Sequence, residues 1–436
     1  MDIFRARRDR LIDAMMAAGG GIAVIPTAPE RERNGGNFFP YRADSQFFYL
    51  CGFCEPQAVL VIQADESPRQ ILFCRAKNEA QEIWTGHRHG PNAAAERFCF
   101  DAAYPIEELD KKLPGLLANQ PALWTSLAAD SEWDRRVLGA IREARSTARA
   151  ENAAPSAVRE ISAVLDEMRL IKDESELATM CRAAEITAAA HCRAMRATRP
   201  NRFEYEIEAE LLHAFRAAGS QFPAYPSIVA SGPNACVLHY VDNDRQMLNG
   251  ELLLIDAGCE LDGYAADITR TFPVNGRFSG PQRDLYQLVL TANLAAQSKV
   301  RPGNDCNAPH EAAVAVLTQG FIDLGLLKGA TQDLIETESY RRFYMHRTSH
   351  WLGLDVHDAG SYKIRGAWRP FVPGMTLTIE PGCYIRPTDD VPEAFWNIGI
   401  RIEDDALVTP DGCEILTGGA PREIEEIEEM MQGQDG

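Results

Sequence analysis

Short apolar runs alternate with helical patterns over the first 171 residues of the chain. Arg5–Ala18 has apolar positions at helical spacing, and three glycines end that pattern. The apolar runs Ile22–Pro26, Ala58–Ile62 and Gln70–Cys74 are typical of buried strands. A further helix is predicted at Ser156–Ile171. Strands that alternate with helices at this spacing predict a mixed α/β domain over residues 1–171.

From residue 172 onward the helical patterns are longer and occur in pairs. Asp173 can cap a new helix, with Glu176 three residues on as its capping-box partner. The first predicted pair is Glu174–Thr198 with Glu204–Ala218, and the second is Gln282–Val300 with Pro309–Leu324. Strand-rich residues follow each pair. Two copies of helix, helix and strands predict a pseudo-twofold α+β domain over residues 172–436, although chance similarity of two helix pairs is an alternative.

A carboxylate interrupts the most apolar run of this second domain. Asp256 lies within Glu251–Gly258, which is apolar on both faces and therefore predicts a buried strand. A buried carboxylate without a partner is costly, so a cation is expected beside it. The Asp262-Gly263 pair favours a tight hairpin, which would lay Asp267 on the strand next to Asp256. Two carboxylates that converge in a core indicate a divalent metal ion.

Further candidate groups come from four distant segments of the same domain. These groups are His239, His346, His350, His357, Glu380, Arg401 and Glu403. Glu380 ends a predicted strand, and alternation in Gly399–Asp405 places Arg401 and Glu403 on one face. Taken singly, a strand aspartate is usually a turn or salt-bridge residue, and His350 alone is more often a packed core histidine. It is the whole set of candidate residues, taken together, that indicates a functional site.

Four carboxylates and one imidazole make an oxygen-rich site. Such a donor set favours Mn²⁺ or Co²⁺ over structural zinc, which prefers sulfur and nitrogen ligands. Two metal ions can share a water molecule, lower its pKa, and bind both the attacking hydroxide and the substrate carbonyl oxygen. Neighbouring histidines would then stabilise the developing oxyanion or the leaving group. This chemistry predicts hydrolysis of an acyl bond.

Composition excludes several other classes of function. A net charge of -19 on 436 residues argues against nucleic acid or an anionic membrane as a partner. The N-terminus has no apolar signal-like stretch, and no window approaches a membrane-spanning length. The eleven scattered cysteines indicate reduced thiols, and the CxxC spacing of Cys51–Cys54 is best explained as fortuitous. A cytoplasmic protein is expected.

The candidate metal-binding segments resemble the motifs of the "pita-bread" metallopeptidases, and most of all those of the aminopeptidase P (Xaa-Pro aminopeptidase) family. The segments that carry the resemblance are Ile255–Gly258 with Asp267, His350–Asp358, Ile379–Gly382, Ile400–Asp404, and Pro40–Arg42 with Gly52–Pro56 in the first domain. The resemblance covers nearly the whole chain. It implies a pita-bread catalytic domain at 172–436, preceded by an α/β domain at 1–171 that serves oligomerisation and pocket closure.

The resemblance also implies roles for individual residues. The implied ligands of two Mn²⁺ ions, with Co²⁺ or Zn²⁺ as substitutes in vitro, are Asp256, Asp267, His350, Glu380 and Glu403, of which Asp267 and Glu403 bridge. Glu380 is also implied as a proton shuttle, and His239, His357 and Arg401 as catalytic groups around the scissile bond and the proline ring. The implied substrate-binding residues are His346, Tyr384 and Trp84, and for Trp84 an ordinary surface loop is the alternative. Arg347 departs from the family, which often has glycine there.

The implied activity is removal of the first residue from peptides whose second residue is proline, with a metal-bridging hydroxide as the nucleophile. An X-Pro bond lacks an N–H and is conformationally restricted, so ordinary peptidases are poorly matched to it. A homotetramer or dimer is expected, again from the resemblance. The alternatives are a prolidase, which cuts only Xaa-Pro dipeptides, and a binding protein on the same fold that has no metal.

Overall fold

The computed structural model of the chain describes residues 3–67, 69–146 and 153–432. The chain forms two compact units, Met1–Met168 and Arg169–Gly436. The sequence pattern had placed the boundary after residue 171. No helix within the described ranges is long and apolar enough to cross a membrane. All eleven cysteines are free thiols.

The N-terminal unit is built on a six-stranded mixed sheet with the strand order β6-β5-β4-β1-β7-β8. In that order the strands are Ala102–Pro105, Gln70–Cys74, Val59–Gln63, Ile22–Pro26, Ala122–Thr125 and Ala157–Glu160. The strands β1, β4 and β5 pair antiparallel, and the other neighbours pair parallel. The sheet packs against α5 (Leu109–Leu117) and α6 (Ser131–Ser146) through one apolar core. The remaining elements are α1 (Ile3–Ala17), α2 (Ser45–Cys51), α3 (Glu79–Thr85), α4 (Gly90–Arg97), β2 (Glu32–Asn34) and β3 (Asn37–Phe38).

Two sequence-based expectations for this unit are wrong in part. The segment Ser156–Ile171 is not one helix, because β8 comes first and α7 (Ser162–Leu170) begins after it. Residues of β8 alternate between half-buried and exposed, and they pair with β7 at the edge of the sheet, which satisfies their backbone groups. The segment around Trp84 is not a loop but the end of the short helix α3.

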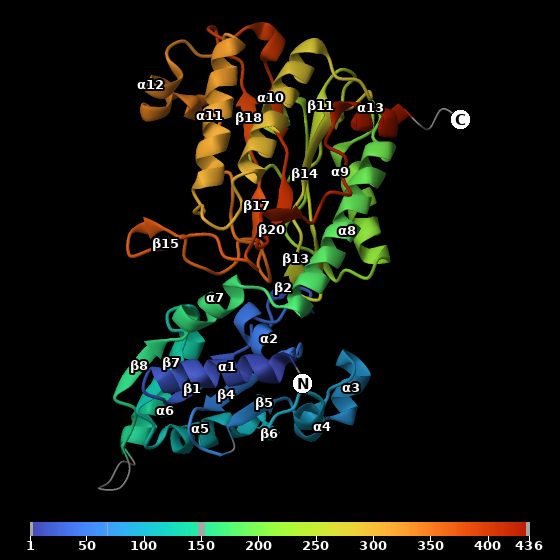
Figure 1. Ribbon diagram of the computed structural model, residues 1–436. Helices are drawn as coiled ribbons and strands as arrows, with labels where there is room; N and C mark the ends of the chain where they lie inside the picture. The colour runs from blue at the N-terminus through green and yellow to red at the C-terminus, as the bar shows by residue number, and fades with distance from the viewer. Residues whose placement is uncertain (1–2, 68, 147–152, 433–436) are drawn as a thin grey trace. The chain divides into compact units, whose positions relative to one another are not determined.

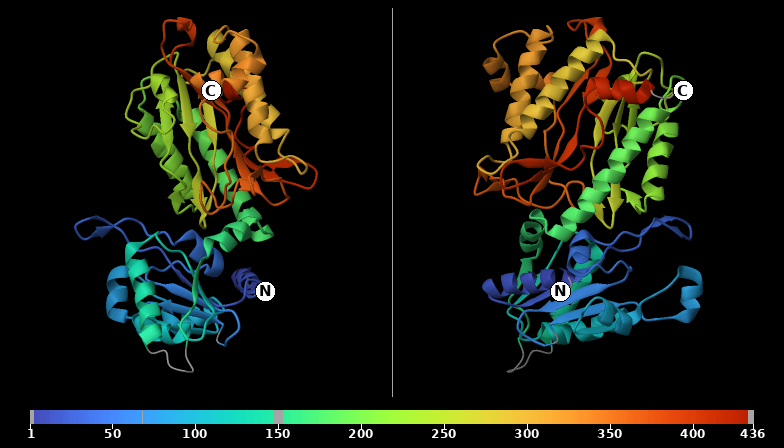
Figure 2. Two further views of the ribbon diagram at one scale, coloured as in Figure 1. Left: turned by 90° about the vertical axis from the view of Figure 1, so that its left-hand side faces the viewer. Right: turned by 45° about the vertical axis from the view of Figure 1, so that its right-hand side comes forward.

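The second unit contains the two predicted helix pairs. They are α8 (Glu174–Ala197) with α9 (Glu204–Ala217), and α10 (Gly280–Gln297) with α11 (Ala308–Asp323). The predicted capping box is confirmed: Asp173 Oδ1 accepts from the backbone of Glu176 at 3.0 Å, and Glu176 Oε2 accepts from the backbone of Asp173 at 3.0 Å. Figure 1 and Figure 2 show the strands of this unit between the two helix pairs.

Each helix pair is followed by its own antiparallel strands. After the first pair, β11 (Leu252–Asp256) lies between β10 (Ile228–Ser231) and β14 (Thr269–Pro273). After the second pair, β20 (Asp404–Val408) lies between β17 (Thr376–Ile379) and β21 (Cys413–Ile415), and β18 (Gly382–Ile385) pairs with β19 (Ile398–Arg401). The smaller elements are β9 (Phe222–Pro223), β12 (Cys259–Leu261), β13 (Tyr264–Ala265), β15 (Lys363–Ile364), β16 (Ala367–Trp368), α12 (Thr331–Glu336) and α13 (Ile424–Gln432).

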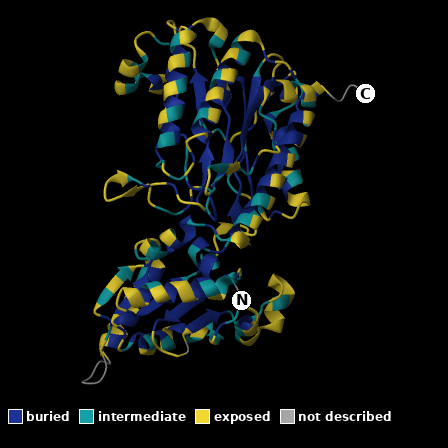
Figure 3. Ribbon diagram, viewed as in Figure 1, coloured by how far each residue is buried: buried dark blue, intermediate teal, exposed yellow. Residues whose placement is uncertain are grey.

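One apolar core joins the two halves of the second unit. It contains Ile186 and Leu211 from the first helix pair, Leu285 and Leu317 from the second, and strand residues such as Ile255. In Figure 3 the strands are buried while the outer faces of the helices are exposed. The expected pseudo-twofold α+β architecture is therefore confirmed, and the strands of both halves meet in the middle.

The predicted hairpin exists, but it places Asp267 differently from the expectation. Asp262 (φ +48°) and Gly263 (φ +85°) form the tight turn between β12 and β13. The chain then bends, and Asp267 lies just before β14, where Thr269 is the residue that pairs with Asp256. Only glycine fits at position 258, because a Cβ there would lie 1.6 Å from the carbonyl oxygen of Ala266. This close backbone approach brings Asp267 back to the end of β11.

Candidate metal centre

Four of the five predicted ligands lie at or next to strand ends, and the fifth, His350, lies in irregular chain beside β17 (Thr376–Ile379). Asp256 is the last residue of β11, and Asp267 comes two residues before β14. Glu380 separates β17 from β18, and Glu403 lies between β19 and β20. The backbone N–H of His350 donates to a threonine hydroxyl of β17 at 3.1 Å. Because a strand end is free of continued ladder pairing, each side chain can turn toward the same point between the two halves.

The position of Glu403 corrects the expectation of one continuous alternating strand. The strand β19 ends at Arg401, and Glu403 lies in the connection to β20. The reason is a change of partner, since β19 pairs with β18 while β20 pairs with β17. The chain crosses from one ladder to the other at Glu403, and the crossing points its carboxylate into the site.

Three of the predicted ligands have the mutual spacing of a metal site. One ligand atom from each of Asp267, His350 and Glu403 lies within 4.8 Å of the other two, and no other such group exists among the residues that the structure describes. The His350 Nε2 atom is 3.6 Å from Asp267 Oδ2 and 3.5 Å from Glu380 Oε1. His350 Nδ1 donates to the carbonyl oxygen of Trp351 at 3.0 Å, so Nε2 keeps the lone pair that can bind a metal.

Asp256 lies outside this group of three but is connected to it. The hydroxyl of Tyr225 is 2.7 Å from Asp256 Oδ1 and also contacts Asp267 Oδ1. Arg401 Nη2 donates to Asp256 Oδ2 at 2.5 Å. The cation that was expected beside Asp256 is therefore Arg401, whose side chain is also buried.

Burial and mutual repulsion disfavour the charged forms of the clustered carboxyl groups. Burial raises the pKa of Asp267 well above its ordinary range, and the charges of Asp256 and Asp405 add to the shift. Burial likewise raises the pKa of Glu403, with the charge of Asp267 next in effect. Burial raises the pKa of Glu380 to about 8, although Arg401 opposes the shift.

The clustered carboxylates therefore fit a bound divalent cation, which would relieve their repulsion. Burial also lowers the pKa of His350 to about 4, so its imidazole is neutral and able to act as a ligand at neutral pH. The donor set of carboxylate oxygens and one imidazole nitrogen is the one that Mn²⁺ and similar ions accept.

Three of the predicted catalytic and substrate-binding residues form one hydrogen-bonded chain. Arg401 Nη1 donates to the hydroxyl of Tyr384 at 2.9 Å, and that hydroxyl is 2.8 Å from His346 Nε2. His346 Nδ1 donates to the carbonyl oxygen of Arg347 at 2.7 Å, so Nε2 accepts from Tyr384. Burial, followed by the charge of Arg401, lowers the pKa of His346 to about 4.

The other predicted residues differ in how closely they join the cluster. The ring of His357 is exposed and meets the ring of His350 edge to face, with centroids 4.4 Å apart. His239 is exposed, and its charge is one of the smaller causes that lower the pKa of His346. Trp84 belongs to the N-terminal unit, where its side chain is 83% exposed.

Sequence reasoning missed several polar residues that touch the predicted ligands. Tyr225 contacts two aspartates, as described above. Thr269 Oγ1 donates to Glu403 Oε2 at 2.6 Å, and Thr378 Oγ1 lies 3.3 Å from Glu380 Oε1. Asp405 accepts from the backbone N–H of Asp267 at 3.1 Å. The threonines stand in buried strands next to the ligands, and a polar residue there was an available signal. Tyr225 had no such local signal.

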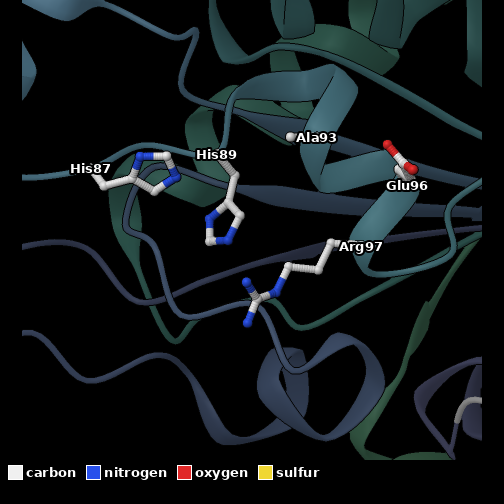
Figure 4. Close-up of a pocket in the computed structure, with 5 residues that line it drawn as sticks. All are labelled: His87, His89, Ala93, Glu96 and Arg97. Carbon is white, nitrogen blue, oxygen red and sulfur yellow. The ribbon is translucent and has the colours of Figure 1, made fainter.

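The N-terminal unit contains a separate hollow of about 590 Å³. It is lined by His87, His89, Ala93, Glu96 and Arg97 (Figure 4). Both histidines already contact acidic side chains, since Glu55 Oε1 is 2.6 Å from His89 Nδ1 and Glu82 Oε1 is 3.5 Å from His87 Nδ1. The described residues of this hollow do not have metal-ligand spacing.

Comparisons with known proteins match both units. The family described as "Metallopeptidase family M24" matches residues 178–410, and "Aminopeptidase P, N-terminal domain" matches residues 4–124. The Xaa-Pro aminopeptidase of Haemophilus influenzae is 44% identical over 98% of this chain and 96% of its own length. That of Escherichia coli is 43% identical over 98% of this chain and 97% of its own length.

Solved structures agree with these sequence matches. Pseudomonas aeruginosa aminopeptidase PepP superposes with a TM-score of 0.96 at 46% identity, over 98% of both chains. An Escherichia coli aminopeptidase P variant in complex with substrate superposes with a TM-score of 0.95 at 42% identity, over 99% of this chain and 98% of that one. The pita-bread architecture of the second unit is therefore shown, and the chain belongs to metallopeptidase family M24, in the group that carries the aminopeptidase P N-terminal domain.

Proposed function

We propose that this chain is a metallo-exopeptidase that hydrolyses the bond between the N-terminal residue of a peptide and a following proline. The observation that carries the proposal is the convergence of acidic ligands from both halves of the second unit around Nε2 of His350. Relatives named Xaa-Pro aminopeptidase match the chain over nearly its whole length. The reaction is hydrolysis of an acyl bond, as the donor set predicted.

In this proposal Asp256, Asp267, His350, Glu380 and Glu403 would hold two divalent metal ions. Mn²⁺ is the proposed metal, because four carboxylates and one imidazole form a hard donor set. Zn²⁺ is the proposed substitute, since an Escherichia coli aminopeptidase P has been solved in a zinc-substituted form. When bound, the ions supply Lewis acidity that activates a water molecule as hydroxide and polarises the scissile carbonyl.

Glu380 is the proposed proton carrier. Its Oε1 lies 3.5 Å from His350 Nε2 at the proposed metal site, so its carboxylate is within reach of a water molecule that the site would hold. It takes the proton of the attacking water and gives it to the proline nitrogen, which must gain a proton when the acyl bond breaks. His346 Nδ1 lies 3.7 Å from Glu380 Oε2, so a polar group is already close to the carrier.

The remaining site residues position the peptide in this proposal. His239, His357 and Arg401 surround the scissile bond and the proline ring. Tyr384 and His346 continue from Arg401 as a fixed hydrogen-bonded chain, which presents an ordered polar wall to the substrate. Preorganised groups of this kind contribute to catalysis because they need no rearrangement when charge develops.

A homo-oligomer, either a dimer or a tetramer, completes the proposed pocket. Trp84 of one copy closes the site of a neighbouring copy. Support comes from the exposure of two large adjacent side chains, Ile83 at 82% and Trp84 at 83%. A solvent-exposed apolar pair of this size is typical of a contact surface. A reducing, cytoplasmic location is also proposed, and the free cysteines support it.

A peptide panel tests the proposed activity. Purified protein loaded with Mn²⁺, Co²⁺ or Zn²⁺ is given an Xaa-Pro-Xaa tripeptide, an Xaa-Pro dipeptide and an Xaa-Ala-Xaa tripeptide, and products are separated by chromatography. Release of the first residue from the proline tripeptide alone, or from it faster than from the dipeptide, supports the proposal. Cleavage confined to the dipeptide identifies a prolidase. Absence of cleavage and of bound metal identifies a binding protein.

A further inference from the structure

The second unit begins with two cations that are paired inside it. The Nζ of Lys172 lies 2.8 Å from Asp358 Oδ2, and both side chains are 1% exposed. Arg169 Nη2 donates to the other oxygen of Asp358 and to Asp355 Oδ2 at 2.7 Å. Asp358 is therefore held by two cations that come from the start of this unit, 186 and 189 residues away in the sequence.

The fold makes room for this ion pair. A Cβ at Gly353 would lie 2.2 Å from Asp358 Oδ2 and 3.0 Å from Lys172 Cε, so only glycine leaves space for both side chains. The backbone N–H of Lys172 donates to the carbonyl oxygen of Gly374 at 2.9 Å, which fixes the segment that carries the ammonium group. The Lys172–Asp358 contact is thus enclosed on several sides and is not a chance surface pair.

The loop that Asp358 closes contains His357 and directly follows His350. Asp358 donates its backbone N–H to the carbonyl oxygen of Trp351 at 2.9 Å, and that bond closes the loop Trp351–Asp358. The ring of His357 is exposed and contacts the ring of His350, whereas the neighbouring side chain of Asp358 is buried. The two consecutive side chains therefore point to opposite sides of the loop. Any shift of Asp358 is passed directly to His357 through one peptide bond.

We propose that Lys172 and Arg169 are positioning residues, which hold Asp358 so that the imidazole of His357 stays beside His350 at the scissile bond. Removing two charges from water is costly, and an apolar pair of equal volume would stabilise the fold as well or better. The charged contact instead fixes the position of Asp358, since a buried carboxylate between two fixed cations has a single favourable position. The inference rests on the proposed function, in which His357 contacts the substrate.

The test uses the metal-loaded, full-length protein and an Xaa-Pro-Xaa tripeptide. The variants are Asp358→Asn and the pair Lys172→Met with Asp358→Asn, each made in the wild-type protein and in a His357→Ala protein. The double change removes both charges together, so it keeps the test usable if Asp358→Asn alone fails to fold. Bound metal is counted for each variant by elemental analysis, and kcat is expressed per metal-loaded molecule.

The expected result is a fall in kcat of about 10- to 100-fold for the double change, the range seen when supporting partners of site residues are removed. Bound metal stays at the wild-type level, and KM changes less than kcat. In the His357→Ala protein the same double change alters kcat by less than about threefold, because the residue that it positions is already gone. An equal fall in kcat in both backgrounds, or no fall in the wild-type background, overturns the inference.

A half-buried ion pair of the same unit serves as the control. Arg245 and Glu251 contact each other at 2.6 Å in the same unit but touch none of the proposed ligands. The pair Arg245→Met with Glu251→Gln is expected to keep kcat within about twofold of wild type, so a kcat loss that matches the Lys172 and Asp358 change would show a purely structural effect and overturn the inference. An inactive wild-type protein would overturn the proposed function together with this inference, whereas an active wild type with an unaffected double variant overturns this inference alone.

Discussion

Arg401 binds Asp256 through a 2.5 Å hydrogen bond from Nη2 to Oδ2, and the same guanidinium also donates to Tyr384 and Thr269. Three donors of one planar group thus fix three different partners. Asp256 is left with Oδ1 facing Tyr225 and the cluster, in a single orientation. The arrangement explains how Asp256, a carboxylate at the end of an apolar strand, is stabilised. Arg401 alone neutralises it, so a second protein cation is not needed in the site.

Arg401→Lys tests whether geometry or charge matters in that contact. Lysine keeps the positive charge, but it lacks the planar fork that reaches Asp256, Tyr384 and Thr269 together. We expect kcat/KM for a proline tripeptide to fall by about 100-fold, in the range measured for loss of preorganised donors. Bound metal should remain near the wild-type level. Arg341→Lys, at an exposed site, is the control. Retention of more than a third of the activity would contradict the assigned role of Arg401.

Asp256→Asn and Asp256→Ala separate metal binding from folding. Both variants lose a negative ligand, so we expect kcat to fall by about 1,000-fold or more, as the loss of several kcal/mol of metal assistance implies. Both are expected to fold, because one fewer carboxylate reduces repulsion in the cluster. Asn still accepts from Arg401, whereas Ala leaves that buried guanidinium short of a partner. The melting temperature of Asp256→Asn should therefore exceed that of Asp256→Ala. Appreciable turnover by either variant would refute the ligand assignment.

The clustered acids make the stability of the metal-free protein depend on pH. The pKa of Glu380 is raised from 4.5 to about 8, and the pKa values of Asp267 and Glu403 are raised as well. Between pH 4.5 and about pH 8 the folded state, through Glu380, binds more protons than the unfolded state. The free energy of unfolding therefore falls as pH rises through this range. Divalent cations replace those protons.

Mn²⁺ should therefore raise the melting temperature of chelator-treated protein more at pH 8 than at pH 5. Scanning calorimetry with and without the metal at the two pH values measures the difference. The Asp256→Asn protein, which lacks one ligand, is the control and should show a smaller metal-dependent shift at both pH values. Identical shifts for the wild type at pH 5 and pH 8 would show that the acids do not exchange protons for metal.

Gly258→Ala tests the close backbone approach that returns Asp267 to the site. The added Cβ would lie 1.6 Å from the carbonyl oxygen of Ala266, so the hairpin must move. We expect a loss of stability of about 3 kcal/mol, at the upper end for overpacking, together with weaker metal binding. Gly280→Ala is the control, since no atom lies within 4 Å of its Cβ and alanine favours the helix that begins there. Denaturant unfolding and metal titration measure both effects.

Asp256 and Glu380 could be singled out from sequence because each ends an apolar run, whereas the full set of proposed ligands was implied by the resemblance to the family. Asp256 and Glu380 stand at the ends of such runs, and the structure places them at strand ends. The exact backbone around Asp267 and Glu403 could not be predicted, because it depends on which strand each segment pairs with. A change of strand partner does not alter the local pattern of apolar and polar residues. The strand β8 was mistaken for the start of a helix for a similar reason, since four residues fit either period.

Tyr225 and Asp358 show a different limit of sequence reasoning. Tyr225 reaches the site because β10 pairs antiparallel with β11, which sets Ile228 opposite Asp256. The spacing of residues around Tyr225 does not indicate this register between β10 and β11. The local sequence around Asp358 does not indicate its ion pair, and only the tertiary fold shows that Lys172 lies against it. In both cases the informative partner is far away in the sequence, so no periodicity could have found it.

The proposed ligands are divided between the two halves of the second unit. Asp256 and Asp267 belong to the first half, while His350, Glu380 and Glu403 belong to the second. Ions shared among them would add a removable cross-link to the apolar packing and to the buried ion pairs, such as Arg270–Asp404 and Arg401–Asp256, that already join the two halves. Removal of the ions by a chelator would then weaken the contact between the two halves and expose the backbone that connects them to proteases. The lifetime of this protein in a cell would follow the supply of divalent metal, quite apart from the activity that the metal supports.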